Sequence, residues 1–355
     1  MPNSVMDGLP FSEEARTALG GDLYRYMLGR ARDAADLQDL NEAEFRRYKL
    51  VPRVLLGNAA TDISTTLCGR HLSAPIVAGA FAGDRVFHAD GLLPIAAACR
   101  ALSLPLVISE ETVTPLAEIC AEHDNCWLQL RAAGPKDRIK GLMDEAASAE
   151  AAGMVLTVLA PVHPVANLQP GGFSIGAEIA RRGWKTIGSK SVGVEPLPAF
   201  PAWSWADLAE VVGHAKSLAL PVMIKGVLNP LDVAEAAAAG CSGIIASNIG
   251  LRQSARWVPA LRQLPALRSE ATMTLGYDGG VRFGSDVVTA AALGADFSIV
   301  VRPLITALVT GGQQAVEAFL KGLIDETLAV ASWCNAATLA DLKPGLLLKD
   351  CEESL

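Results

Sequence analysis

The sequence predicts a (β/α)8 barrel, a closed sheet of eight parallel strands surrounded by helices. Short aliphatic and β-branched runs alternate with Ala-rich segments from about residue 75 onward, which is typical of repeated βα units. Eight such runs are present, the number that closes a parallel barrel. Polar residues that could carry chemistry stand at the ends of these runs: Ser109, Gln129, Thr157, Lys225, Ser247, Asn248, Asp278 and Arg302. In a barrel these positions meet at one mouth.

The predicted strands are short and almost continuously apolar, as expected for strands buried on both faces. They span residues 74–79, 104–109, 126–130, 154–160, 220–226, 243–248, 272–279 and 297–303. Helices are predicted over residues 91–102, 137–152, 230–239 and 284–293, among others, because each stretch is amphipathic or Ala-rich and ends near a glycine. A doubly wound open sheet is the less favoured alternative, since no GxGxxG motif follows the first strand.

The segments outside this repeat are expected to cover the barrel. Residues 1–50 are interpreted as N-terminal helices, and residues 52–74 as a strand-and-turn segment that leads into the first barrel strand. Residues 164–203 are the longest irregular connection and are rich in Gly, Pro and Ser, which is typical of a lid or binding loop. We expect a single domain over residues 1–355, because barrels longer than ~250 residues commonly fold as one unit.

The composition indicates a globular protein and argues against several classes of partner. Of 355 residues, 51% are hydrophobic and 19% charged, far more apolar than a disordered chain. The formal net charge of -8, with scattered Lys and Arg, argues against nucleic acid binding. The seven cysteines show no CxxC pair or zinc-like spacing, so we expect reduced thiols, no metal site and a cytoplasmic protein. Neither a signal peptide nor an apolar stretch of ~18 residues is apparent, so no membrane association is expected.

A phosphate-binding turn is predicted after the seventh strand. The motif DGGVR places Asp278, Gly279, Gly280 and Arg282 there, and Arg302 follows the eighth strand. Barrels commonly bind phosphate at this place through backbone N–H groups and a cation. The alternative interpretation is an ordinary glycine turn with two arginines in surface ion pairs.

Four passages make the chain similar to the FMN-dependent α-hydroxy acid oxidase and dehydrogenase family, which includes glycolate and lactate oxidases. They are LPVMIKGV at 220–227, GIIASNIGLRQ at 243–253, DGGVRFGSDVVTAAALGA at 278–295 and RP at 302–303. The resemblance extends from about residue 22 to about residue 348. It implies a (β/α)8 barrel, an FMN cofactor and a homotetramer.

The resemblance also implies where FMN binds. Lys225 would lie beside the N1–C2 carbonyl region of the flavin, where a positive charge stabilises the anionic reduced ring. Asp278 would contact the ribityl chain. The other implied cofactor contacts are Ala80, Phe81, Ala82, Ser109, Gln129, Thr157, Ser247, Gly279, Gly280, Arg282, Val301 and Arg302. Val301 departs from the family pattern, which usually has glycine there.

The substrate end departs further from the family. In the family motif SNHGxRQ the histidine takes the hydroxyl proton of the substrate, but the matching run SNIGLRQ has Ile249, which cannot accept a proton. Arg131 replaces a tyrosine, Leu159 replaces the aspartate that partners the histidine, and a second carboxylate-binding arginine falls at about Ala166. Only Arg252, the arginine that binds the substrate carboxylate, is retained. Ordinary oxidation of 2-hydroxy acids is therefore not expected.

Other residues could take part in a changed reaction. Arg131 and Arg252 are candidate anion-binding residues, because a buried arginine is costly unless it meets an anion. His163, in a loop after the fourth strand, is a candidate acid or base, although a structural or solvated histidine is the commoner case. Glu110 and Glu111 are interpreted as the start of the next helix, where carboxylates favour the positive end of the dipole.

The N-terminal run YRYMLG (24–29) resembles the family's YYxSG stretch, which lends a tyrosine to the substrate pocket. Alignment without a gap places Arg25 at that tyrosine, whereas a one-residue shift would place Tyr24 or Tyr26 there. The contact therefore has more than one candidate.

These observations together predict an FMN-dependent oxidoreductase that acts on a small or medium anionic substrate without the usual histidine. Two alternatives stay open at this point. One is a non-redox flavin-dependent isomerase or lyase, and the other is a non-catalytic flavin-binding partner subunit.

Overall fold

The computed structural model describes residues 12–29, 39–57, 60–160, 173–189 and 202–350, and these contain the predicted (β/α)8 barrel. Its parallel strands are β4 (Ile76–Ala78), β5 (Leu106–Ser109), β6 (Cys126–Arg131), β7 (Gly153–Thr157), β8 (Val222–Val227), β9 (Gly243–Ser247), β10 (Thr274–Asp278) and β11 (Phe297–Val300). Each strand pairs with the next one along the chain, and β11 closes the barrel by pairing with β4. The barrel prediction is therefore confirmed, and the open sheet is excluded.

The barrel wall is buried on both sides, which explains the continuous apolar runs. Val77, Val107, Val155, Met223 and Ile245 form one core cluster. Their neighbours along each strand belong to a second, larger cluster that includes the helices. This separation is expected when alternate residues of each strand face opposite sides of the wall.

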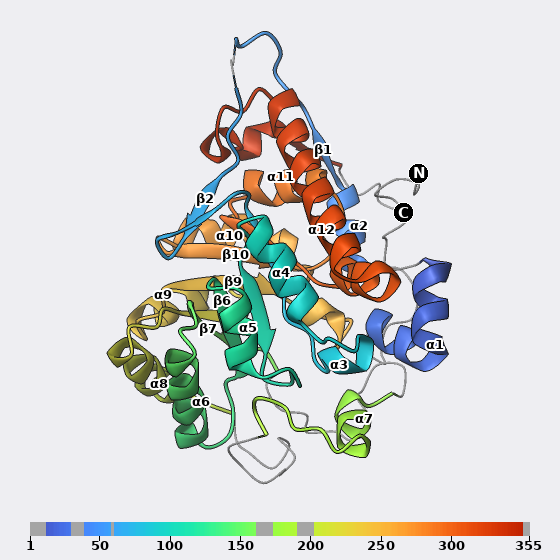
Figure 1. The fold of residues 1–355 in the computed structure, drawn as a ribbon. Helices are drawn as coiled ribbons and strands as arrows, with labels where there is room; N and C mark the ends of the chain where they lie inside the picture. The colour runs from blue at the N-terminus through green and yellow to red at the C-terminus, as the bar shows by residue number, and fades with distance from the viewer. Residues whose placement is uncertain (1–11, 30–38, 58–59, 161–172, 190–201, 351–355) are drawn as a thin grey trace.

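Helices cover the outside of the barrel (Figure 1). They are α3 (Asp84–Phe87), α4 (Leu93–Ala101), α5 (Leu116–Glu122), α6 (Lys136–Ser148), α8 (Trp205–Ser217), α9 (Leu231–Ala238), α10 (Ala260–Glu270), α11 (Gly284–Ala292) and α12 (Arg302–Trp333). The four helices predicted by range correspond to α4, α6, α9 and α11. The predicted strand over 297–303 is too long, because Arg302 and Pro303 open α12. None of the helices in the described segments is long and apolar enough to cross a membrane.

The N-terminal part of the chain contains α1 (Glu13–Leu28), α2 (Leu40–Arg46) and β1 (Tyr48–Leu50). The prediction of helices up to residue 50 is wrong at its end, because β1 pairs antiparallel with β12 (Leu347–Lys349). A strand whose partner lies so far along the chain leaves no local pattern.

The covering segments differ in how well they were predicted. The strand-and-turn prediction over 52–74 is confirmed by a hairpin of β2 (Thr65–Leu67) and β3 (Arg70–Leu72). The connection over 164–203 is not irregular throughout, since it contains α7 (Ile175–Arg181), which begins at the N-cap Ser174. Short 3-10 turns complete the described elements: η4 (Ile249–Leu251), η5 (Leu339–Asp341) and η6 (Pro344–Leu346).

Candidate functional site

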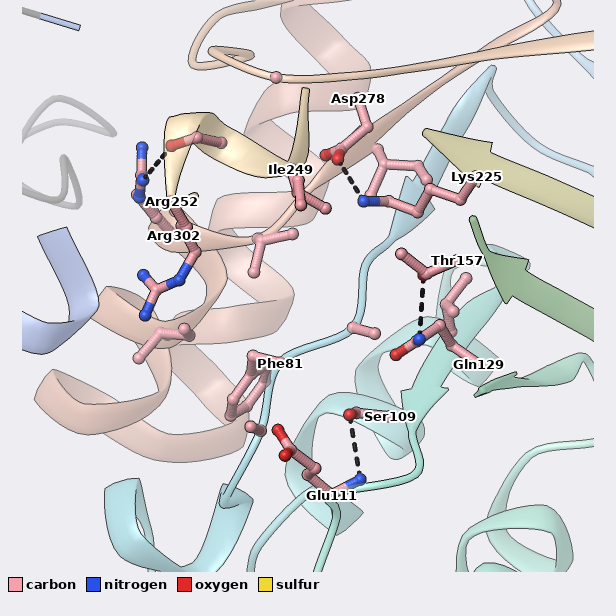
Figure 2. A pocket seen from close by; sticks show the side chains of 18 of the residues that line it. Phe81, Ser109, Glu111, Gln129, Thr157, Lys225, Ile249, Arg252, Asp278 and Arg302 are labelled. Carbon is pink, nitrogen blue, oxygen red and sulfur yellow. Dashed lines mark hydrogen bonds and ion pairs between the residues drawn. The ribbon is translucent and has the colours of Figure 1, made fainter. Parts of the chain in front are cut away.

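A cavity of about 360 Å³ lies at the carboxyl ends of the barrel strands (Figure 2). Most of the predicted cofactor residues line it: Ala80, Phe81, Ala82, Ser109, Gln129, Thr157, Lys225, Asp278, Gly279, Gly280, Arg282, Val301 and Arg302. Three of the predicted catalytic residues, Lys225, Arg131 and Arg252, line it as well. His163 and Ala166 fall outside the described residues.

Lys225 is held at the cavity wall by two residues from the next strands. Its Nζ lies 2.7 Å from Asp278 Oδ2 and donates a hydrogen bond to Ser247 Oγ at 3.1 Å. Ser247 Oγ in turn donates to the same carboxylate oxygen at 2.7 Å. The register of β8, β9 and β10 brings the three strand ends together. Ser247 is fully buried and does not line the cavity, but it positions the ammonium group of Lys225, whose pairing with Asp278 is visible in Figure 2.

The neighbouring strand ends present smaller polar groups to the same cavity. Gln129 Nε2 donates to Thr157 Oγ1 at 3.0 Å across β6 and β7. Ser109 Oγ accepts a hydrogen bond from the backbone of Glu111 at 3.1 Å. These contacts fix side chains that the resemblance places along a flavin ring.

The DGGVR turn packs tightly against α2. Gly279 and Gly280 have φ values of +135° and +74°, in the region that favours glycine. A Cβ on Gly280 would lie 2.8 Å from the carbonyl carbon of Asn41 and 2.9 Å from the backbone nitrogen of Glu42. The turn therefore needs glycine both for its conformation and for the close approach of α2.

Arg282, in this turn, has a buried hydrogen-bond donor without an acceptor among the described residues. Its Nη2 lies 2.7 Å from Glu42 Oε1 in a buried ion pair, and its Nη1 donates to the carbonyl of Val281 at 2.8 Å. Nε is buried and donates no hydrogen bond within the described part of the chain. Burial lowers the pKa of Arg282. A buried guanidinium with a free donor suits an anion such as phosphate.

Arg302 lines the cavity but is already engaged. Its Nη1 lies 2.8 Å from Asp39 Oδ2, and the pair is buried rather than on the surface. Its Nη2 donates to the carbonyl of Gly250 at 3.2 Å, and its Nε to that of Met27 at 3.3 Å. The alternative interpretation, in which Arg282 and Arg302 form surface ion pairs, is therefore wrong. Their acidic partners, Glu42 in α2 and Asp39 just before it, were not recognisable from the sequence.

Arg252 lies at the substrate end and contacts α1. Its guanidinium lies 4.6 Å from the centre of the Tyr26 ring, and Nη1 donates to the carbonyls of Tyr26 at 3.1 Å and Gly29 at 3.3 Å. Burial lowers the pKa of Arg252, and the nearby charge of Arg302 adds to this effect. Among the described residues, no carboxylate forms an ion pair with Arg252.

Of the two tyrosines in the N-terminal run, Tyr26 lines the cavity. Arg25, which alignment without a gap placed there, is exposed and pairs with Asp22 instead. The one-residue shift arises because Tyr26 and Met27 form the buried side of α1, while Arg25 points to solvent. The buried side of α1 therefore places Tyr26 at the cavity, and the alignment without a gap was wrong by one residue.

Arg131 forms an ion pair inside the cavity, with Nη2 lying 2.6 Å from Glu111 Oε1. Burial alone would lower the pKa of Arg131, but the two neighbouring glutamates raise it. Glu110 is buried beside Arg138 and accepts the backbone N–H of Arg131 at 2.9 Å. The interpretation of both glutamates as the start of a helix is wrong, since α5 begins only at Leu116. The carboxylates of the loop before α5 point inward, where they pair with the partly buried Arg131 and Arg138.

The position of the expected base is apolar. Ile249 lines the cavity in η4, and Leu159 lines it nearby. Around this cavity, the described residues include no histidine. Among the described residues, the carboxylates that line it are those of Asp278, which pairs with Lys225, and Glu111.

The chain is similar to known flavin-dependent proteins over most of its length. Residues 15–349 match a family described as FMN-dependent dehydrogenase. An L-lactate oxidase of Roseobacter sp. (strain GAI101) is 29% identical, over 96% of this chain and 95% of the relative. The 2-Hydroxyacid oxidase 1 of Homo sapiens is 30% identical, over 93% of this chain and 94% of the relative. A solved mandelate oxidase variant with the C4a-OH-FMN adduct has a TM-score of 0.79 and 27% identity, covering 94% of this chain and 96% of that chain.

Proposed function

Because the chain belongs to the FMN-dependent dehydrogenase family, with FMN as its cofactor, we propose that it oxidises or reduces a small or medium anionic substrate without the family's usual histidine base, whose place Ile249 takes. When bound, FMN supplies the site that accepts or donates the hydride. The residues of this chain bind the cofactor, orient the substrate and exclude water.

The cofactor residues support this proposal by their chemistry. Arg282 and the backbone of the DGGVR turn would hold the phosphate, and the buried Nε of Arg282 offers a donor for it. Lys225, held by Asp278, would keep a positive charge beside the ring as negative charge develops there.

The observation that carries the proposed substrate class is the environment of Arg252. This guanidinium is partly buried at the cavity wall, and it has the Tyr26 ring and two carbonyls but no carboxylate partner among the described residues. A buried cation is costly to leave uncompensated, so a carboxylate of the substrate would be its natural partner.

The altered chemistry follows from the apolar side of the same cavity. Ile249 and Leu159 cannot accept a proton, so removal of a hydroxyl proton by a base at this position is not available. We therefore propose that lactate-like 2-hydroxy acids are poor substrates, and that the true substrate loses its proton more easily or binds as an amine or conjugated acid.

A panel of anaerobic titrations tests this proposal. The FMN-loaded protein is mixed with 2-hydroxy acids, 2-amino acids and conjugated carboxylic acids, while the flavin absorbance is followed. Bleaching by an anionic compound outside the simple 2-hydroxy acids is expected. Conversion of a compound without any flavin redox change would favour the isomerase or lyase, and failure of every compound would favour the partner subunit. Failure to retain flavin would overturn the proposal altogether.

A further inference from the structure

The substrate end of the cavity has an unusual set of charges. Arg131, Arg252 and Glu111 all line it, and Arg302 lies next to them with its charge met by Asp39. Figure 2 shows Glu111 on the opposite side of the cavity from Lys225 and Asp278, close to Phe81. The charges of Arg131 and Glu111 cancel, which leaves Arg252 as the cation without a carboxylate partner among the described residues.

Glu111 is fixed in the cavity at two points. Its Oε1 lies 2.6 Å from Arg131 Nη2, and its backbone N–H donates to Ser109 Oγ at 3.1 Å. Its Oε2 accepts no hydrogen bond from the described residues, and the side chain keeps 31% of its exposure. One carboxylate oxygen is therefore available to a ligand, and it can only accept a hydrogen bond.

The Arg131–Glu111 pair constrains the charge of a ligand. A single carboxylate can meet Arg252, and a hydroxyl or amino group beside it can donate to Glu111 Oε2. A second carboxylate would find Arg131 already paired. It would also face the negative charge of Glu111 in a partly buried site, where repulsion between like charges weakens binding.

We propose that Glu111 is a specificity-determining residue that admits ligands with one carboxylate and a neighbouring hydrogen-bond donor, and that rejects dicarboxylates. This inference rests on the proposed function, since it assumes that Arg252 binds the substrate carboxylate. Arg131 then acts through Glu111, by orienting its carboxylate, rather than as an anion clamp.

Three anions without a hydrogen on the reacting carbon test this proposal by binding alone. 2-Hydroxyisobutyrate has one carboxylate and a hydroxyl, methyltartronate replaces one of its methyl groups by a second carboxylate, and pivalate replaces its hydroxyl by a methyl group. The dissociation constant of each is measured on the FMN-loaded protein from the change in flavin absorbance. We expect 2-hydroxyisobutyrate to bind at least about tenfold more tightly than either of the others.

The variant Glu111→Gln keeps the shape of the side chain and removes its charge. It should improve methyltartronate binding relative to 2-hydroxyisobutyrate by about tenfold or more, because Arg131 becomes available to the second carboxylate. Glu118→Gln is the matched control, since Glu118 is exposed on α5 and should leave the ratio unchanged. Retained FMN and an unchanged melting temperature show that each variant is folded.

The outcomes separate this inference from the function on which it rests. If 2-hydroxyisobutyrate binds but Glu111→Gln does not change its ratio to methyltartronate, the role of Glu111 is wrong and the anion site stands. Tighter binding of methyltartronate to the unaltered protein would show that a ligand displaces Glu111 from Arg131, which also overturns the inference. If no anion perturbs the bound flavin, the substrate class proposed for this cavity is wrong as well.

Discussion

The substitution Gly280→Ala tests the phosphate turn, because its cost can be worked out from the structure. Gly280 has φ +74°, and a residue with a Cβ pays about 1–2 kcal/mol there. The added Cβ would also lie 2.8 Å and 2.9 Å from backbone atoms of Asn41 and Glu42, which cannot rotate away. Relief requires a shift of α2, and overpacking of this kind typically adds about 1–3 kcal/mol. We expect a total loss of about 3 kcal/mol.

A shift of α2 would also reach the site. Asn41 exchanges amide hydrogen bonds of 3.0 Å and 2.7 Å with Asn248, and Glu42 pairs with Arg282 at 2.7 Å. The same movement should therefore weaken FMN binding, by about tenfold or more if one such contact is lost.

Two measurements and one control variant test the effects expected of Gly280→Ala. Urea unfolding of the FMN-free protein gives the loss of stability, and flavin fluorescence titration gives the FMN dissociation constant. Gly141→Ala, in the middle of α6, is the control, because a Cβ there meets nothing within 4 Å. It should stabilise the protein by about 0.5–1 kcal/mol and leave FMN binding unchanged. Equal effects of Gly280→Ala and Gly141→Ala would show that the close contact between Gly280 and α2 does not limit stability or FMN binding.

Two further substitutions test the electrostatics in and beside the site. Asp286, in the first turn of α11, accepts the backbone N–H groups of Arg282 at 2.8 Å and Phe283 at 3.0 Å. Burial raises the pKa of Asp286 to about 6 in the folded protein. The folded state therefore binds this proton more tightly than the unfolded chain does. The stability that the bound proton contributes is lost as the pH rises from about 4 through about 6. In Asp286→Asn this loss, which is on the order of 3 kcal/mol, should be absent from the pH dependence of the free energy of unfolding. If that free energy changes in parallel for both proteins between about pH 4 and about pH 7.5, the prediction is wrong. Arg252→Met should weaken 2-hydroxyisobutyrate binding by about 30- to 100-fold while FMN still binds, and an unchanged dissociation constant would show that the carboxylate binds elsewhere.

The barrel was predictable because each of its units has a local signal. Apolar runs, glycines after helices and polar residues at strand ends recur along the chain, and the closed geometry brings those ends together. Lys225, Ser247 and Asp278 could therefore be placed in one site from the sequence, and their contacts confirm this grouping.

The parts that were missed depend on contacts between distant segments. The pairing of β1 with β12 and the acidic partners of Arg282 and Arg302 have no periodic pattern of their own. The sequence favoured a helix start at Glu111, because carboxylates are common in the first turn of a helix. That its side chain points into the cavity follows only from its ion pair with Arg131. A strand-end arginine without an expected anion was the one signal that could have suggested a buried partner.

We propose that this chain binds FMN as its family does but has no base at position 249, where Ile249 stands. The direct measurement is the rate of flavin bleaching when the FMN-loaded protein and its Ile249→His variant are mixed anaerobically with lactate, glycolate or mandelate. Ile249→Val serves as the control for a change of shape. We expect the histidine variant to bleach at least about 100-fold faster than the unaltered protein and the valine variant, since a positioned base contributes about 10²–10⁴-fold. Bleaching of the unaltered protein as fast as the histidine variant would show that the missing histidine does not limit this reaction.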